Sequence, residues 1–181
     1  MNNQIAKKFD TLSLLKFTLP SMIMMLFMAL YQMVDAVFVS NFVSETALSA
    51  LNIVYPLISF IIAVAIMLAT GGSAVIAKKM GEGEHALARQ LFSMVVLIGV
   101  LFGIAMTLVG IFFTRPLIHL MGSTPALDPY CYDYLYTLML FSPFAVLQLL
   151  FQTFFITAGK PHLGLVVTVL AGIANIFFDF L

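Results

Sequence analysis

The stretch TALSALNIVYPLISFIIAVAIMLATGGSAVIA, residues 46–77, is the strongest indication of the fold, because it contains no charged residue. A helix needs about 20 apolar residues to cross the hydrocarbon core of a bilayer. The stretch is long enough for such a helix, and four other parts of the sequence show the same pattern. We therefore expect five membrane helices, at about residues 14–40, 51–77, 89–114, 130–157 and 161–181.

Composition independently excludes a soluble globular protein. Hydrophobic residues make up 62% of the 181 residues and charged residues 9%, with a mean hydropathy of +1.11. An ordinary globular domain has about 25% charged residues. The predicted fold class is therefore an all-α integral membrane protein. The first apolar run exceeds the length of a signal-peptide core and no small-residue cleavage site follows it, so we expect it to be retained.

Charge and reactive residues exclude several functions. The formal net charge is zero, which leaves no electrostatic basis for nucleic-acid binding. Cys131 is the only cysteine, and the three histidines are not spaced as metal ligands. No Ser-His-Asp or Cys-His arrangement is visible. We therefore expect neither an enzyme nor a bound cofactor.

The lysines and arginines predict the orientation in the membrane. Seven of the eight lie before the first predicted helix, between the second and third, or between the fourth and fifth. Only Arg115 lies on the other side. Positive residues favour the cytoplasmic side, so the amino terminus is expected in the cytoplasm.

Prolines and glycines inside the predicted helices predict kinks and close helix packing. Pro20, Pro56 and Pro143 are expected to kink or locally open the helices that contain them. Gly99 and Gly103, with Gly110 close to the same face, predict a close approach of helices.

Two acidic residues interrupt the apolar runs and are the candidates for chemistry. Asp35 lies 19 residues after Lys16, and Asp179 lies 18 residues after Pro161, so the two acids reach similar depths in the outer half of the membrane. Asn175 precedes Asp179 by one turn on the same helix face. Together the three residues offer hard oxygen ligands for a proton or Na⁺. The alternative is that both acids lie at the outer interface, where an ionised carboxylate costs little free energy.

Other polar residues are candidates for lining a cavity. Tyr31 and Gln32 flank Asp35, and Gln148 and Gln152 share a face of the fourth predicted helix. For the two glutamines, interhelical hydrogen bonding is the alternative interpretation.

The order of several segments resembles the multidrug and toxic compound extrusion (MATE) family. LPSMIMMLFMALYQMVDAVFVS, residues 19–40, resembles its first helix, and ALSALNIVYPL, residues 47–57, the start of its second. AKKMGEGE, residues 77–84, resembles its basic loop with glycine, and ITAGKPHLGLVVTVLAGIANIFFDFL, residues 156–181, its fifth helix with the preceding turn. Departures are Ser40-Asn41, where glycine is expected, and Asn52.

The resemblance implies a fold and an activity. MATE members have twelve helices in two six-helix lobes and exchange organic, often cationic, compounds for Na⁺ or H⁺. In prokaryotic members, a helix-one aspartate and a helix-five Asn-x-x-x-Asp form a coupling site, which implies this role for Asp35, Asn175 and Asp179. The resemblance also implies a multi-pass protein of a prokaryotic cytoplasmic membrane that exports small molecules.

The five predicted helices would form an incomplete six-helix lobe. We therefore expect a fragment or truncated product that lacks the carboxy-terminal lobe and does not transport alone. One alternative is a related flippase for lipid-linked precursors, although the five runs offer no cationic residue within the membrane. The other is a membrane protein that transports nothing.

Overall fold

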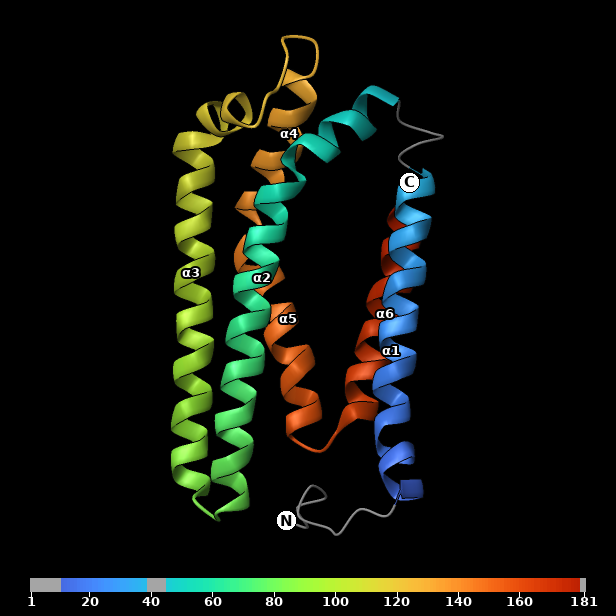
Figure 1. The fold of residues 1–181 in the computed structure, drawn as a ribbon, viewed down its shortest axis with the longest axis vertical. Coiled ribbons are helices and arrows are strands. Elements are labelled where there is room, and N and C mark those ends of the chain that lie inside the picture. The colour runs from blue at the N-terminus through green and yellow to red at the C-terminus, as the bar shows by residue number, and fades with distance from the viewer. Residues whose placement is uncertain (1–10, 39–44, 180–181) are drawn as a thin grey trace. The chain divides into compact units, whose positions relative to one another are not determined.

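The computed structural model describes residues 11–38 and 45–179, which form helices joined by short connections and contain no strand. Within these ranges some side chains are outside the description, among them those of Tyr31, Gln32, Asp35, Asn175 and Asp179. The helices are α1 (Thr11–Phe38), α2 (Glu45–Gly81), α3 (His85–Leu120), α4 (Asp128–Leu140), α5 (Ser142–Thr157) and α6 (Pro161–Asp179) (Figure 1). The all-α prediction is therefore confirmed.

The chain forms two compact units, and each unit takes parts of several helices. Unit 1 consists of Met1–Ala36, Ala69–Ser93 and Phe151–Leu181. Unit 2 consists of Val37–Leu68 and Met94–Leu150. The residues of the predicted coupling site all belong to unit 1.

Two described helices are long and apolar enough to cross a membrane, Thr46–Gly81 and His85–Leu120. The bent pair α4–α5 would be a third if it is counted as one span. Shorter apolar helices, Thr18–Leu30 and Pro161–Ala174, lie where the first and fifth spans are expected. The expected second and third helices extend beyond their predicted ends, because the charged residues near the α2–α3 connection continue the helices into the polar region.

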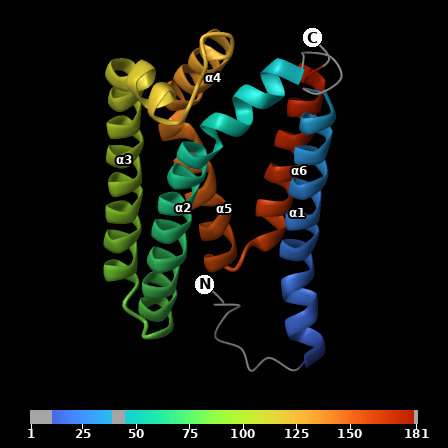
Figure 2. The same cartoon turned by 45° about the horizontal axis from the view of Figure 1, so that its top comes forward.

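The expected single helix over residues 130–157 is two helices in the structure. α4 and α5 are bent by 55° at a break that contains Phe141. Pro143 follows in the first turn of α5, where a missing backbone N–H is tolerated. The sequence predicts a kink at Pro143, and the structure has a break there. α2 runs through Pro56 as one assigned helix, and both views show it bent in its amino-terminal half (Figure 2).

A buried hydrophobic cluster in unit 2 lies between α2, α3 and α4. Its buried members come from all three helices: Ala50, Val54, Ile118, Cys131, Leu135 and Met139. The thiol of Cys131 is fully buried and donates to the carbonyl oxygen of Ala50 at 3.7 Å. The lone cysteine therefore packs as a small core residue.

The predicted close approach along the glycines of α3 is confirmed within unit 2. A side-chain carbon added at Gly103 would clash with the backbone of Pro143, and one added at Gly110 would lie 2.5 Å from Cβ of Met139. One added at Gly99 would clash with Leu150. Glycine is needed most clearly at Gly103, where α3 packs directly against the backbone of Pro143, whereas the contact at Gly99 is with the end of a flexible leucine side chain.

In unit 1, the turn between α5 and α6 sets the start of α6. Gly159 has φ +71°, a conformation that favours glycine. Its N–H donates to the carbonyl of Ile156, and the N–H of Lys160 donates to that of Phe155, both at 2.9 Å. This is a Schellman motif, which ends α5 and lets Pro161 begin α6.

Candidate functional site

The three residues of the predicted coupling site lie on two helices of unit 1. Asp35 belongs to the last turn of α1, whereas Asn175 and Asp179 belong to the last part of α6. Their side chains lie outside the description, so their mutual distances stay predictions. The packing of α1 against α6, in contrast, is described at two levels closer to their amino termini.

The first level of contact joins Met24 and Gly164. Met24 is almost fully buried, and its Sδ would lie 3.5 Å from a side-chain carbon added at Gly164. This is an ordinary van der Waals distance, so the sulfur of Met24 packs directly against α6 at Gly164. Both views show α1 and α6 side by side and running in the same direction (Figures 1 and 2).

The second level is one turn further along both helices and is bridged by Gln152 from the end of α5. The Nε2 group of Gln152 donates to Sδ of Met28 at 2.8 Å and lies 3.4 Å from Oγ1 of Thr168. Since an amide NH₂ group has two protons, it can serve both neighbours at once. Gln152 therefore forms the interhelical hydrogen bonds that the sequence left as one of its two interpretations.

Both levels of contact have the same register. Residues 24 and 164, and residues 28 and 168, differ by 140 in number. A constant difference is expected where two parallel helices pack with little crossing over a few turns. If the same difference continues, it relates each later residue of α1 to the residue of α6 at the same level.

The other cavity-lining candidates contribute less. The side chains of Tyr31 and Gln32 lie outside the described part of the chain. Gln148 is exposed on α5 and belongs to unit 2. Their predicted role in lining a cavity is not tested by these positions.

Sequence reasoning missed a polar cluster at the helix break in unit 2. The hydroxyl of Thr107 on α3 lies 3.0 Å from the carbonyl oxygen of Met139, and that of Ser142 lies 2.9 Å from the carbonyl oxygen of Gly103. The two hydroxyl groups are 3.4 Å apart. They supply partners to carbonyls that the break and the close approach of the helices leave in an apolar environment. The Ser-Pro pair at 142–143 is the signal that could have indicated them.

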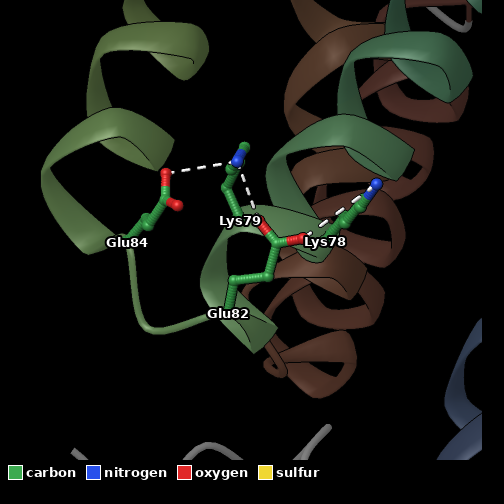
Figure 3. A network of polar contacts seen from close by, with 4 residues as sticks. All are labelled: Lys78, Lys79, Glu82 and Glu84. Carbon is green, nitrogen blue, oxygen red and sulfur yellow. Dashed lines mark hydrogen bonds and ion pairs between the residues drawn. The ribbon is translucent and has the colours of Figure 1, made fainter.

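A second polar cluster lies at the connection between α2 and α3. Lys79 contacts Glu82 at 2.8 Å and Glu84 at 3.2 Å, and Lys78 lies 4.0 Å from Glu82 (Figure 3). The hydrogen bond from Lys79 lowers the pKa of the Glu82 carboxyl group from its ordinary value. The contribution of this hydrogen bond to stability is therefore present at neutral pH, and it is lost as the pH falls through the lowered pKa of Glu82.

No group of three or more histidine, cysteine, aspartate or glutamate residues that could hold a metal ion is found where the structure describes side chains. The side chains of Asp35, Asn175 and Asp179 lie outside that part of the chain.

The comparison with family models decides the family. The MatE model matches residues 20–181, which is nearly the whole chain. The chain belongs to the MatE family. The MatE match includes the parts of α1 and α6 that carry the candidate coupling residues, and it confirms the resemblance found in the sequence.

Two curated relatives align with most of this MatE chain. The "Multidrug export protein MepA" of Staphylococcus saprophyticus is 22% identical over 166 residues, which are 92% of this chain and 37% of the relative. The "FAD transporter" of Shewanella oneidensis is 24% identical over 166 residues, which are 92% of this chain and 36% of the relative. The chain thus spans less than two fifths of the length of either relative.

A solved structure supports the fold. The structure of the MATE multidrug transporter DinF-BH, determined in complex with a ligand, superposes with a TM-score of 0.86 at 25% identity, over 91% of this chain and 37% of that one. The described helices therefore have the fold of a MATE transporter segment.

Proposed function

We propose that this chain is part of a secondary active transporter that exports organic, often cationic, compounds in exchange for Na⁺ or H⁺. Membership of the MatE family and the similarity to a multidrug export protein support this proposal. The chain spans less than two fifths of the length of its relatives. The transport activity is therefore proposed for the full-length transporter, and the tests use that protein.

The proposal of a coupling site rests mainly on the register between α1 and α6. Asp35 lies seven residues after Met28, and Asn175 lies seven residues after Thr168. Seven residues are about two helical turns, so each residue shares a face with the contact residue before it. The difference of 140 that holds at both described levels also relates residues 35 and 175. If the register continues, Asp35 and Asn175 face each other across the contact between the two helices.

Asp179 completes the proposed site from one turn further along α6. One turn is about 5.4 Å, which the length of a carboxylate side chain and a bound ion can bridge. Two carboxylates and one amide then surround the ion with oxygen ligands of the kind that Na⁺ uses. Without Na⁺, a proton can neutralise one carboxylate, which reduces the cost of burying two like charges.

Coupling then follows from the position of the site between two packed helices. Binding of Na⁺ or H⁺ removes repulsion between the acids and favours close packing of α1 on α6. Loss of the ion favours separation of the same helices. A ligand that binds one arrangement better than the other shifts the equilibrium, and this would switch a central cavity between substrate-binding and substrate-releasing states.

FAD is a second candidate substrate, because one relative is called an FAD transporter and aligns with this chain as completely as the multidrug export protein does. Organic cations remain the first candidate, since the proposed site is acidic and no described lysine or arginine lies in the middle of an apolar run. A flippase for lipid-linked precursors is less favoured for the same reason.

The proposed location is a prokaryotic cytoplasmic membrane with the amino terminus in the cytoplasm. The asymmetry of lysine and arginine supports this orientation, and the bacterial relatives support the type of cell.

The deciding experiment measures export by full-length variants. Asp35→Asn and Asp179→Asn should each abolish efflux of a cationic dye while abundance in the membrane stays near that of the wild type. Asparagine keeps the size and hydrogen bonding of aspartate but supplies no charge and exchanges no proton. Arg115→Ala is the control, because Arg115 contacts the ring of Tyr132 in unit 2 and is far from both acids in sequence. Normal dye efflux by both asparagine variants would refute the coupling site, and export of FAD but no dye by the wild type would favour the second substrate.

A further inference from the structure

Unit 1 contains a cavity that the proposed transport mechanism does not use. It has a volume of about 390 Å³ and lies among the end of α2, the start of α3 and the end of α5. Most of its wall is apolar and includes Ile76, Met80, Phe92 and Phe154. The rings of Phe92 and Phe154 meet edge to face with their centroids 5.0 Å apart, which gives this wall a fixed shape.

Two residues that can carry a positive charge also line the cavity, His85 and Arg89. Arg89 forms no ion pair among the residues that the structure describes. Glu82 and Glu84, the carboxylates of unit 1 whose side chains are described, are both held by Lys79, and Glu82 also contacts Lys78 (Figure 3). The arginine therefore has no described counter-ion, although both of these carboxylates are close to it in the sequence.

The cavity lies at the boundary between apolar helix and polar connection. α2 and α3 are the two long apolar helices, and the charged residues of this cavity wall lie in the first turns after their connection. Phe92 follows Arg89 by about one turn towards the apolar part of α3. The wall thus passes from a guanidinium group to aromatic rings within about one helical turn.

We propose that this cavity binds an anionic phospholipid of the adjacent leaflet. The phosphate contacts Arg89 and His85, and an acyl chain packs against Phe92 and Phe154. A guanidinium group matches phosphate with two parallel hydrogen bonds. A free phosphate ion would leave the aromatic wall without a partner, whereas an organic cation would be repelled by Arg89. In the orientation proposed above, the leaflet is the cytoplasmic one, which carries negative surface charge.

The test measures retention of defined lipids by the purified full-length protein using native mass spectrometry. The wild type should retain phosphatidylglycerol in preference to phosphatidylcholine, and Arg89→Gln should weaken phosphatidylglycerol binding about tenfold, since it removes the charged partner of the phosphate. Arg89→Lys should retain part of the affinity. Arg115→Gln is the matched control and should bind phosphatidylglycerol as the wild type does.

Three results would overturn the proposal. The first is equal retention of the two lipids by the wild type. The second is unchanged phosphatidylglycerol binding by a well-folded Arg89→Gln variant. The third is competition by millimolar inorganic phosphate at constant ionic strength, which would indicate a site for a free anion. If Arg89→Gln does not fold, the lipid preference and the phosphate competition of the wild type still decide.

Discussion

The hydroxyl group of Thr107 on α3 donates a hydrogen bond to the carbonyl oxygen of Met139 on α4 at 3.0 Å. Met139 lies just before the break between α4 and α5, where the regular helical partner of a carbonyl group is lost. In an apolar environment such a group needs a substitute donor. The hydroxyl group of Ser142 donates to the same oxygen at 2.8 Å, so Thr107 and Ser142 together make the break in the fourth predicted span compatible with a membrane.

Replacement of Thr107 should test this role directly. Thr107→Val keeps the shape of the side chain but removes one of the two hydroxyl donors to the Met139 carbonyl, and it should lower the stability of the full-length protein by about 1 kcal/mol. Thr107→Ser keeps the hydroxyl group and should be close to the wild type. Thermal unfolding in one detergent compares the three proteins. Equal stability of the valine variant would show that the hydrogen bond from Ser142 satisfies the carbonyl by itself.

A methyl group at Gly103 should disturb the contact between α3 and the break. The added carbon would clash with the backbone of Pro143, which cannot move as a flexible side chain does. Gly103→Ala should therefore destabilise the protein by about 1–3 kcal/mol. Gly81→Ala is the control, because nothing lies within 4 Å of the added carbon there. Similar melting temperatures for both variants would contradict the close packing.

Cross-linking can test the register of α1 and α6 separately from transport. In a protein with Cys131→Ser and no other cysteine, the pair Asp35→Cys and Asn175→Cys should react with a short bifunctional thiol reagent. The pair Asp35→Cys and Thr168→Cys should react much less, since it is displaced by about 10 Å along the helices. Mass shifts of the modified protein measure both. Preferential reaction of the second pair would refute the continued register, even if both acids proved essential.

The amide of the proposed site should matter less than its acids. Asn175→Ala removes one uncharged ligand, so it should raise the Na⁺ or H⁺ concentration needed for half-maximal dye efflux by several-fold while transport remains measurable. Asn175→Asp would add a third carboxylate and should make coupling more dependent on pH. Efflux measured across a series of Na⁺ concentrations and pH values distinguishes these variants. Complete loss of transport in Asn175→Ala, with normal abundance, would assign this residue more than a ligand role.

Fusions to a reporter that is active only in the cytoplasm should test the orientation. The reporter should be active after Gly83, in the α2–α3 connection, and inactive after Ser44 or Pro125. The distribution of lysine and arginine predicts this pattern. Activity after Ser44 would reverse the orientation and would place the phospholipid cavity in the other leaflet.

Particular elements show how far sequence reasoning reached. The uncharged run 46–77 predicts α2 without reference to any neighbour, and Gly99, Gly103 and Gly110 predict a packing face on α3. The break at Phe141 could be predicted only as a kink at Pro143. Its extent depends on whether a neighbour can satisfy the carbonyls that are freed, and the sequence does not name Thr107 as that neighbour.

The candidate site, too, could be predicted from the sequence only in part. Asp35, Asn175 and Asp179 could be selected from the sequence because charge and amide groups are costly in lipid and therefore stand out from apolar runs. The register that relates α1 to α6 could not, because residues 24 and 164 are far apart in the chain and only packing brings them together. Counting from Lys16 and Pro161 predicts similar depths for Asp35 and Asp179, whereas the register at Met24 and Met28, if it continues, predicts that Asp35 is level with Asn175, one turn before Asp179.

Hydropathy was enough to predict an all-α membrane protein, since it acts locally along the chain and needs no tertiary contact, and the order of the segments that resemble the MATE family indicated the family. Three features emerged only from the folded chain: that the kink in the fourth predicted helix is a full break of 55°, which helix α1 packs against, and that Arg89 lines an apolar cavity without a described counter-ion. These features depend on distances between residues remote in sequence. Such distances follow from the way side chains fill space and satisfy polar groups between helices. The hydropathy along one helix does not predict them.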